Sequence, residues 1–168
     1  MKKIFLFCAW LAACSNAPSD KGLSVWQNYF QENPAQYALF DVDHDGILEA
    51  FTQKNGQYAI FSCGASCQNV RKIFEFSDEK AQHSVLILEN VPIIYAKEND
   101  AQSTWHIKLK NSTPIATLHA GTQNGQPYFS FNQQEIGFMA VIEIQEKEFP
   151  ELNENTKAVD IQTLTWQG

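Results

Sequence analysis

Four acidic side chains crowd into nine positions of the stretch ALFDVDHDGILEAF. Asp41, Asp43 and Asp45 alternate along the chain, Gly46 follows directly, and Glu49 comes three residues later. Like charges this close repel one another unless a cation lies among them. A hard cation such as Ca²⁺ takes about six to eight oxygen ligands, and alternate residues of a tight loop can point their carboxylates at one centre. The spacing therefore predicts a Ca²⁺ site built from these four side chains.

The stretch resembles the nine-residue calcium loops, with a strand on each side, of FG-GAP and related repeats and of many secreted bacterial lipoproteins. In that family the first, third, fifth and ninth positions supply side-chain oxygens, and the seventh supplies a backbone carbonyl. Carried over, these ligands are Asp41, Asp43, Asp45, Glu49 and the carbonyl of Ile47. The family usually has Gly where His44 stands, which implies a left-handed backbone there. An EF-hand would instead need a bidentate Glu at its twelfth position, where Thr52 stands.

Two other interpretations of the acidic stretch stay open. It could be a solvated, Asp-rich turn without a metal. It is also similar to the nucleophile loop of haloacid-dehalogenase-type phosphatases, in which Asp41 would attack phosphate and Asp43 would act as acid and base with Mg²⁺. That family has Thr where Asp45 stands, and it needs a downstream Lys and an acidic pair on a parallel α/β scaffold. We therefore favour a calcium site that stiffens the fold.

The first residues have the features of an export signal. Lys2 and Lys3 precede the apolar run 4–13, which is too short to cross a membrane. The run ends in LAAC, and here the sequence resembles bacterial lipoproteins, in which small residues before an invariant Cys direct cleavage and the Cys is acylated. The resemblance implies a lipid on Cys14, typically including palmitate. In the alternative, an ordinary cleaved signal, Cys14 is incidental.

The lipoprotein resemblance also implies a domain organisation. Residues 1–13 are the signal peptide, residues 14–23 form a tether rich in Ser, Asn, Pro and Gly, and residues 24–168 form a single β-rich domain. Ser15 follows the acylated Cys where an Asp would suggest retention in the inner membrane, so the bacterial outer membrane is the expected location. The expected partners are the membrane, through the lipid anchor, and a protein or glycan that the sequence does not identify.

Two cysteines remain once Cys8 leaves with the signal and Cys14 is acylated. Cys63 and Cys67 lie in the stretch CGASC and would be exposed to an oxidising compartment, which predicts a local disulfide. A copper or redox function would normally need a thioredoxin-like βαβ context or nearby His ligands, and neither is visible.

A short helix is expected directly after the tether. In SVWQNYFQENP, Ser24 and Gln27 have the spacing of a capping box, Trp26 and Phe30 share one face, and Pro34 ends the helix.

From residue 36 onward the pattern changes to short β-rich runs divided by turn residues, several of which alternate between apolar and polar side chains. Asn55-Gly56 and Asn124-Gly125 are strong hairpin turns. No βαβ alternation appears. The fold class is therefore mainly β, an antiparallel meander, sandwich or small barrel with one short N-terminal helix. The expected strands include YALFD, ILEAFTQ, YAIFS, IFEFS, SVLILE, IIYAK, WHIKLK, PIATLH, YFSFN, FMAVIEIQ and AVDIQTLTW.

Charge and motifs exclude several function classes. Removal of the signal leaves 10 basic against 19 acidic residues, so the formal charge changes from −7 to −9. Nucleic acid is therefore not an expected partner. No GxSxG, HExxH or phosphate-cradling Gly loop is present. His83, His106 and His119 are scattered, and we expect them at the surface or satisfied in the core.

Tryptophan and tyrosine offer an alternative function. An aromatic platform could bind sugar, as in carbohydrate-binding modules that also carry structural calcium, although such residues are more often part of the core. The candidates are Trp26, Trp105, Trp166, Tyr58, Tyr95 and Tyr128. Taken together, the sequence predicts an exported lipoprotein with a structural Ca²⁺ loop that acts in binding or envelope structure rather than in catalysis.

Overall fold

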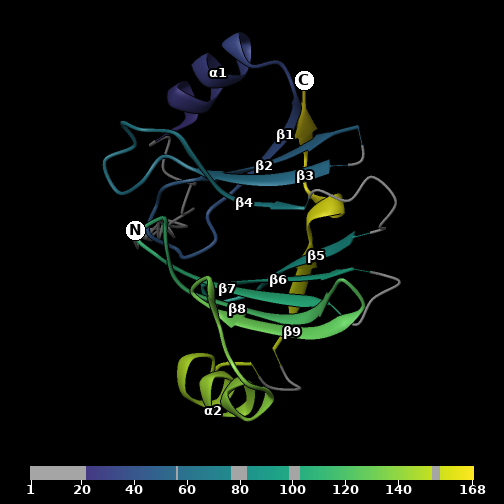
Figure 1. Cartoon of the computed structure of the whole chain (residues 1–168). Coiled ribbons are helices and arrows are strands. Elements are labelled where there is room, and N and C mark those ends of the chain that lie inside the picture. The colour runs from purple at the N-terminus through teal and green to yellow at the C-terminus, as the bar shows by residue number, and fades with distance from the viewer. Residues whose placement is uncertain (1–21, 56, 77–82, 99–102, 153–155) are drawn as a thin grey trace, which may run out of the picture.

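Four layers are stacked in the computed structural model, in the order helix, sheet, sheet, helix (Figure 1). The structure describes residues 22–55, 57–76, 83–98, 103–152 and 156–168. Helix α1 lies on the outer face of the first sheet, and α2 lies on the outer face of the second.

The elements follow one another along the chain as two strand-rich segments, each associated with one helix. Their bounds are α1 Leu23–Glu32, β1 Gln36–Phe40, β2 Glu49–Lys54, β3 Gln57–Ser62, β4 Arg71–Phe76, β5 His83–Leu88, β6 Ile93–Glu98, β7 Thr104–Lys110, β8 Thr113–Gln123, β9 Gln126–Phe131, β10 Gln134–Glu135, α2 Phe138–Glu148, β11 Ala158–Asp160, the 3₁₀ turn η1 Ile161–Thr163 and β12 Trp166–Gln167.

Every described strand pair is antiparallel. The five-stranded sheet has the order β12-β1-β2-β3-β4, and the seven-stranded sheet has the order β10-β9-β8-β7-β6-β5-β11. The prediction of a mainly β chain is therefore confirmed, and of the expected architectures the structure has the sandwich.

The main core lies between the two sheets. Phe51 and Ile60 from the five-stranded sheet pack in one cluster with Ile94 and Ile107 from the seven-stranded sheet, and all four are 1 % exposed or less. Because successive side chains of a strand point to opposite faces of its sheet, these four side chains mark the faces on which the two sheets meet across the sandwich.

Helix α1 begins one residue earlier than expected, and its cap differs from the prediction. Gly22 is the N-cap, with φ 95°, and no side chain caps the helix. Ser24 therefore lies inside the first turn, and the capping box with Gln27 is wrong. A glycine is required here because a Cβ at Gly22 would lie 2.9 Å from Sγ of Cys67. The helix ends at Glu32, before Pro34, as predicted.

The run FMAVIEIQ forms a helix, not a strand. Helix α2 continues to Glu148 because the strong helix formers Glu146 and Lys147 extend the run beyond its apolar part. Val141 is buried against the second sheet, and Ile144 packs beside it at the spacing of one helical turn. The described part of the chain therefore has two α-helices rather than one.

The run AVDIQTLTW also differs from the prediction. It is not one strand, because the chain crosses here from one sheet to the other: β11 pairs with β5, and β12 pairs with β1. The 3₁₀ turn between them carries Ile161, which is 2 % exposed and fills the core at the crossing.

Candidate metal centre

The acidic loop connects β1 to β2 and is folded tightly on itself. His44 has φ 55° and Gly46 has φ 84°, so both adopt the left-handed conformation, as the resemblance implies for His44. The backbone N–H of Asp45 donates to Oδ1 of Asp41 at 3.1 Å, and that of Gly46 donates to Oδ2 at 2.9 Å. Asp41 thereby organises the turn from its first position.

Three of the four predicted carboxylates meet at one place. One oxygen from each of Asp41, Asp43 and Glu49 lies within 4.8 Å of the other two. Two oxygens on opposite sides of a Ca²⁺ ion are about 5 Å apart, since each lies about 2.3–2.6 Å from the ion. The spacing therefore suits a Ca²⁺ ion held between them.

Glu49 is the fully buried member of this group of carboxylates. It is 0 % exposed, its Oε2 accepts the backbone N–H of Val42 at 2.9 Å, and its Oε1 lies 2.5 Å from Oγ of Ser112. Burial raises the pKa of the Glu49 carboxyl to about 8, and the neighbouring carboxylates of Asp43 and Asp45 add to this effect. A cation bound among these carboxylates would favour the charged form.

Asp43 carries an oxygen whose hydrogen-bonding capacity is unused. Its Oδ2 accepts the backbone N–H of Ser112 at 2.8 Å. Its Oδ1 is buried and has no hydrogen-bond partner among the described residues. Buried carboxylate oxygens are rarely left without a partner, and a bound metal ion is one of the few explanations for such an atom.

Asp45 and Ile47 lie beside the three-carboxylate group rather than within it. The backbone N–H of Ile47 donates to Oδ1 of Asp45 at 2.8 Å, and the Ile47 side chain is buried under α1. Burial also raises the pKa of Asp45. The predicted role of the Ile47 carbonyl as a ligand stays a prediction.

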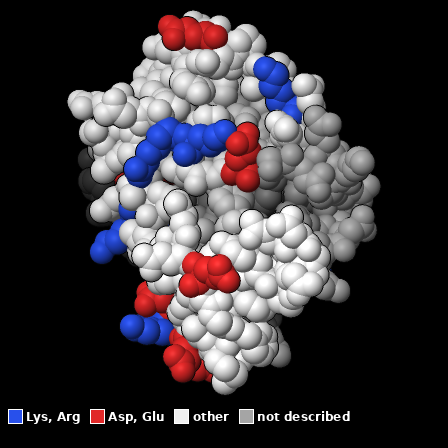
Figure 2. Space-filling view, in the orientation of Figure 1, with Lys and Arg blue, Asp and Glu red and all other residues white. Residues whose placement is uncertain are grey.

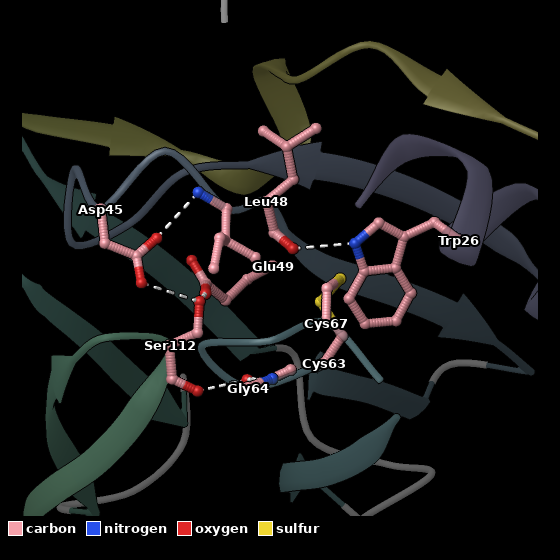
Figure 3. The surroundings of a disulfide bond; sticks show 10 residues. Trp26, Asp45, Leu48, Glu49, Cys63, Gly64, Cys67 and Ser112 are labelled. Atoms are coloured by element: carbon pink, nitrogen blue, oxygen red, sulfur yellow. Dashed lines mark hydrogen bonds between the residues drawn. A yellow bond between two sulfur atoms is a disulfide. The ribbon is translucent and has the colours of Figure 1, made fainter. Parts of the chain in front are cut away.

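Ser112 is the residue of this site that the sequence analysis missed. It lies with Asn111 in the two-residue turn between β7 and β8, where both residues have positive φ, 55° at Ser112. Figure 3 shows its side chain directed at the acidic loop from the other sheet, and Oγ lies 3.4 Å from Oδ2 of Asp45 as well as close to Glu49. The dipeptide marks a hairpin turn, but its 63-residue separation from Glu49 gives no local signal of the contact.

The predicted disulfide between Cys63 and Cys67 is present and lies next to this network. Ser62, the residue before Cys63, donates from Oγ to the carbonyl oxygen of Ser112 and accepts the backbone N–H of Gly64 at 3.0 Å. The disulfide loop, the β7–β8 turn and the acidic loop are therefore joined by hydrogen bonds at one end of the sandwich (Figure 3).

His106 and His119 lie away from this site. His119 is 8 % exposed, stacks on Trp105 at 3.8 Å, and has its Nε2 2.9 Å from Oγ of Ser103. His106 packs between Tyr95 and Phe149. Burial lowers the pKa of His106 to about 4 and also lowers that of His119. Of His83 only the backbone, in β5, is described.

The six aromatic residues proposed as a sugar platform do not share one surface. Trp26 belongs to α1 and is 0 % exposed, and its Nε1 donates to the carbonyl of Leu48 at 2.8 Å. Trp105 packs against the core between the sheets, as do Tyr58 and Trp166, whereas the Tyr95 ring contacts the His106 ring and the Tyr128 ring contacts the His119 ring. These six rings therefore do not form one platform in the structure.

The haloacid-dehalogenase alternative needs a parallel scaffold around Asp41. Here Asp41 follows β1, which pairs antiparallel with both β2 and β12. The loop geometry therefore fits an ion-binding turn between antiparallel strands better than a nucleophile loop. Cys14, the predicted signal peptide and nearly all of the predicted tether lie outside the described residues.

Comparisons of the chain with protein-family models, with curated proteins and with solved structures find no match.

Proposed function

We propose that this chain is an exported, lipid-anchored protein of the bacterial envelope whose β sandwich is stiffened by one Ca²⁺ ion in the acidic loop. Its role on this proposal is binding or envelope structure rather than catalysis. The observation that carries the metal proposal is the meeting of the Asp41, Asp43 and Glu49 carboxylates around one point, with Glu49 fully buried.

The chemistry of the donor set supports a hard cation. All three meeting side chains are carboxylates, and neither His nor Cys belongs to the group among the described residues. Zinc and copper sites normally include nitrogen or sulfur ligands, whereas Ca²⁺ takes oxygen ligands in a flexible geometry. Ca²⁺ would hold Glu49 in its charged form and would give the buried Oδ1 of Asp43 a partner.

Lipid attachment at Cys14 rests on the sequence LAAC and its place after an apolar run. Within the described part of the chain, neither helix is both long and apolar enough to span a bilayer. Expression with a labelled fatty acid tests the anchor. We expect the label on the wild type and its loss in Cys14→Ser, and label retained in Cys14→Ser would refute acylation at this residue.

Calcium binding is tested by titrating Ca²⁺ into the chelator-treated protein, by calorimetry and by thermal melting, with Mg²⁺ as the comparison. Extracellular modules bind Ca²⁺ with dissociation constants on the order of 10⁻⁴ to 10⁻³ M. At ten times its dissociation constant, the ion stabilises the native state by about 1.4 kcal/mol, which corresponds to a rise in Tm of about 3–6 °C.

Glu49→Gln is the informative variant. Because burial raises the pKa of Glu49 to about 8, the metal-free fold favours the protonated carboxyl, and glutamine imitates this neutral form. We expect the metal-free variant to melt near the wild type and to lose the Ca²⁺-dependent rise. Glu143→Gln, an exposed position on α2, is the matched control and should keep the rise. An unchanged rise in Glu49→Gln, or no Ca²⁺ binding by the wild type at several times the upper end of this range, would refute the site.

A further inference from the structure

Helix α1 covers only part of the outer face of the first sheet, and a hollow of about 290 Å³ opens beside its C-terminal end. Pro34 ends the helix above this face. The strand positions beneath the hollow include Thr52 and Ala59, which lie opposite each other on β2 and β3 and have small side chains. Because the helix is short and the side chains beneath it are small, neither of them fills the hollow.

A second hollow, of about 570 Å³, lies on the other side of the same helix end. It is bounded by α1 and by β1 and β12, and it shares Phe30, Pro34 and Ala35 with the first hollow. The two hollows therefore adjoin around the end of α1, and together they form a site that we call the α1 groove, defined by the residues that line the two hollows.

The α1 groove is lined mainly by uncharged hydrogen-bonding groups and by aromatic rings. Its five carboxamide side chains are Gln27, Gln31, Asn33, Gln57 and Gln167. Its rings come from Tyr29, Phe30, Tyr37 and Phe61. Phe30 and Tyr37 stack on each other with their centroids 4.2 Å apart and are each 8 % exposed, so the more exposed rings are those of Tyr29 and Phe61. Tyr29 and Phe61 stand at an angle of 51° with their centroids 5.7 Å apart.

Charge is scarce in the α1 groove although the chain as a whole is acidic. Lys72 and Glu75 pair with each other at 2.5 Å, which leaves Lys54 as the only other charged side chain among the described lining residues. On the face that Figure 2 shows, charged side chains stand apart in small groups and form no continuous basic or acidic patch. The lining thus matches an uncharged ligand rather than a polyanion.

We propose that the α1 groove binds a neutral oligosaccharide. Carboxamides both donate and accept hydrogen bonds, which suits sugar hydroxyls, and aromatic rings present an apolar face to the C–H surface of a sugar ring. The first hollow is at the small end of the range for ligand pockets, so one or two rings fit there, and the second hollow accommodates the continuing chain. This inference is independent of the calcium proposal.

The test is calorimetric titration of the full chain with maltohexaose, cellohexaose, mannohexaose and chitohexaose, with hexagalacturonate as the acidic comparison. Ala59→Leu places a larger side chain at the first hollow, and Gln31→Ala removes a carboxamide from the second. Ala158→Leu, on exposed β11 of the other sheet, is the matched control. Thermal melting of each variant shows whether it is folded.

We expect saturable binding of at least one neutral sugar, at least tenfold weaker in Ala59→Leu, weaker in Gln31→Ala, and unchanged in Ala158→Leu. Should Ala59→Leu fail to fold, the loss in Gln31→Ala carries the test. No neutral sugar bound at millimolar concentration, preferential binding of hexagalacturonate, or binding that both groove variants retain would each overturn the proposal.

Discussion

Replacement of Ser112 by alanine probes the contact between the two sheets directly. The Ser112 hydroxyl lies 2.5 Å from Oε1 of Glu49, and Glu49 is 0 % exposed. Alanine removes this hydroxyl, and water does not reach the oxygen that loses its partner. The backbone N–H of residue 112 still donates to Asp43 in the variant, so the change isolates the side-chain contact.

The size of the effect follows from this burial. A buried polar group left without a partner costs about 1–3 kcal/mol. For a chain of this size, each kcal/mol corresponds to about 2–4 °C in Tm. We therefore expect the free energy of unfolding of Ser112→Ala to be about 2 kcal/mol lower than that of the wild type, and its Tm to be about 4–8 °C lower.

Glycine at the same position provides an internal check. Ser112 has φ 55°, a left-handed conformation that costs a residue with a Cβ about 1 kcal/mol and costs glycine very little. Ser112→Gly loses the same hydroxyl but avoids the cost of the left-handed backbone, so it should be about 1 kcal/mol more stable than Ser112→Ala.

Urea unfolding in the presence of a chelator measures these differences without any contribution from metal. Ser66→Ala, at an exposed serine of the disulfide loop, is the matched control and should unfold like the wild type. The reasoning fails if Ser112→Ala lies within experimental error of the wild type, or if Ser112→Gly is the less stable of the two variants.

Two further predictions follow from half-buried His106 and buried Gly121 in the second sheet. The pKa of His106 is about 4 in the folded chain and about 6.5 when unfolded, so the unfolded state binds more protons between these values and His106 lowers the stability as the pH drops from 6.5 to 4. Glu49, whose pKa is raised, contributes with the opposite sign in both proteins. Urea unfolding across this window should therefore show that the wild type loses up to about 3 kcal/mol relative to His106→Phe, and parallel pH profiles of the two proteins would contradict the assignment. Gly121→Ala should lower Tm by several degrees, because a Cβ there would lie 2.6 Å from Oγ of Ser103 and 2.9 Å from Nε2 of His119, and an unchanged Tm would show that these side chains yield easily.

The acidic loop was predictable because its chemistry is local. The carboxylates that meet lie within nine residues, and Gly46 and His44 take the left-handed turns that such a loop requires. Ser112 was not predictable, because a turn residue 63 positions away reaches Glu49 only after the two sheets have packed. Sequence spacing thus identifies the carboxylates that meet in the loop but not the residue that supports them.

The fold class was also predictable from local signals. The two runs that were predicted wrongly, at α2 and after Ala158, both depend on residues distant in sequence. Alternation along each strand reports which face is buried, and this signal is local. Helix α2 and the split strand after Ala158 depend instead on neighbours distant in sequence. Val141 and Ile144 gain burial on the second sheet as a helix, and Ile161 fills the core only because the chain changes sheets beside it.

The acidic loop and the disulfide also fix the helix that forms one wall of the α1 groove. Nε1 of Trp26 donates to the carbonyl of Leu48, which directly precedes Glu49, and Gly22 at the start of α1 lies against the Cys63–Cys67 bridge. A change in the acidic loop can therefore reach α1 through the Leu48 carbonyl, although no ligand of the proposed ion lines the groove. Because Trp26 is also held by the apolar core beneath α1, this effect should be small. Chelation should accordingly weaken sugar binding less than Ala59→Leu does, and a larger effect of chelation would mean that the ion contacts the sugar itself.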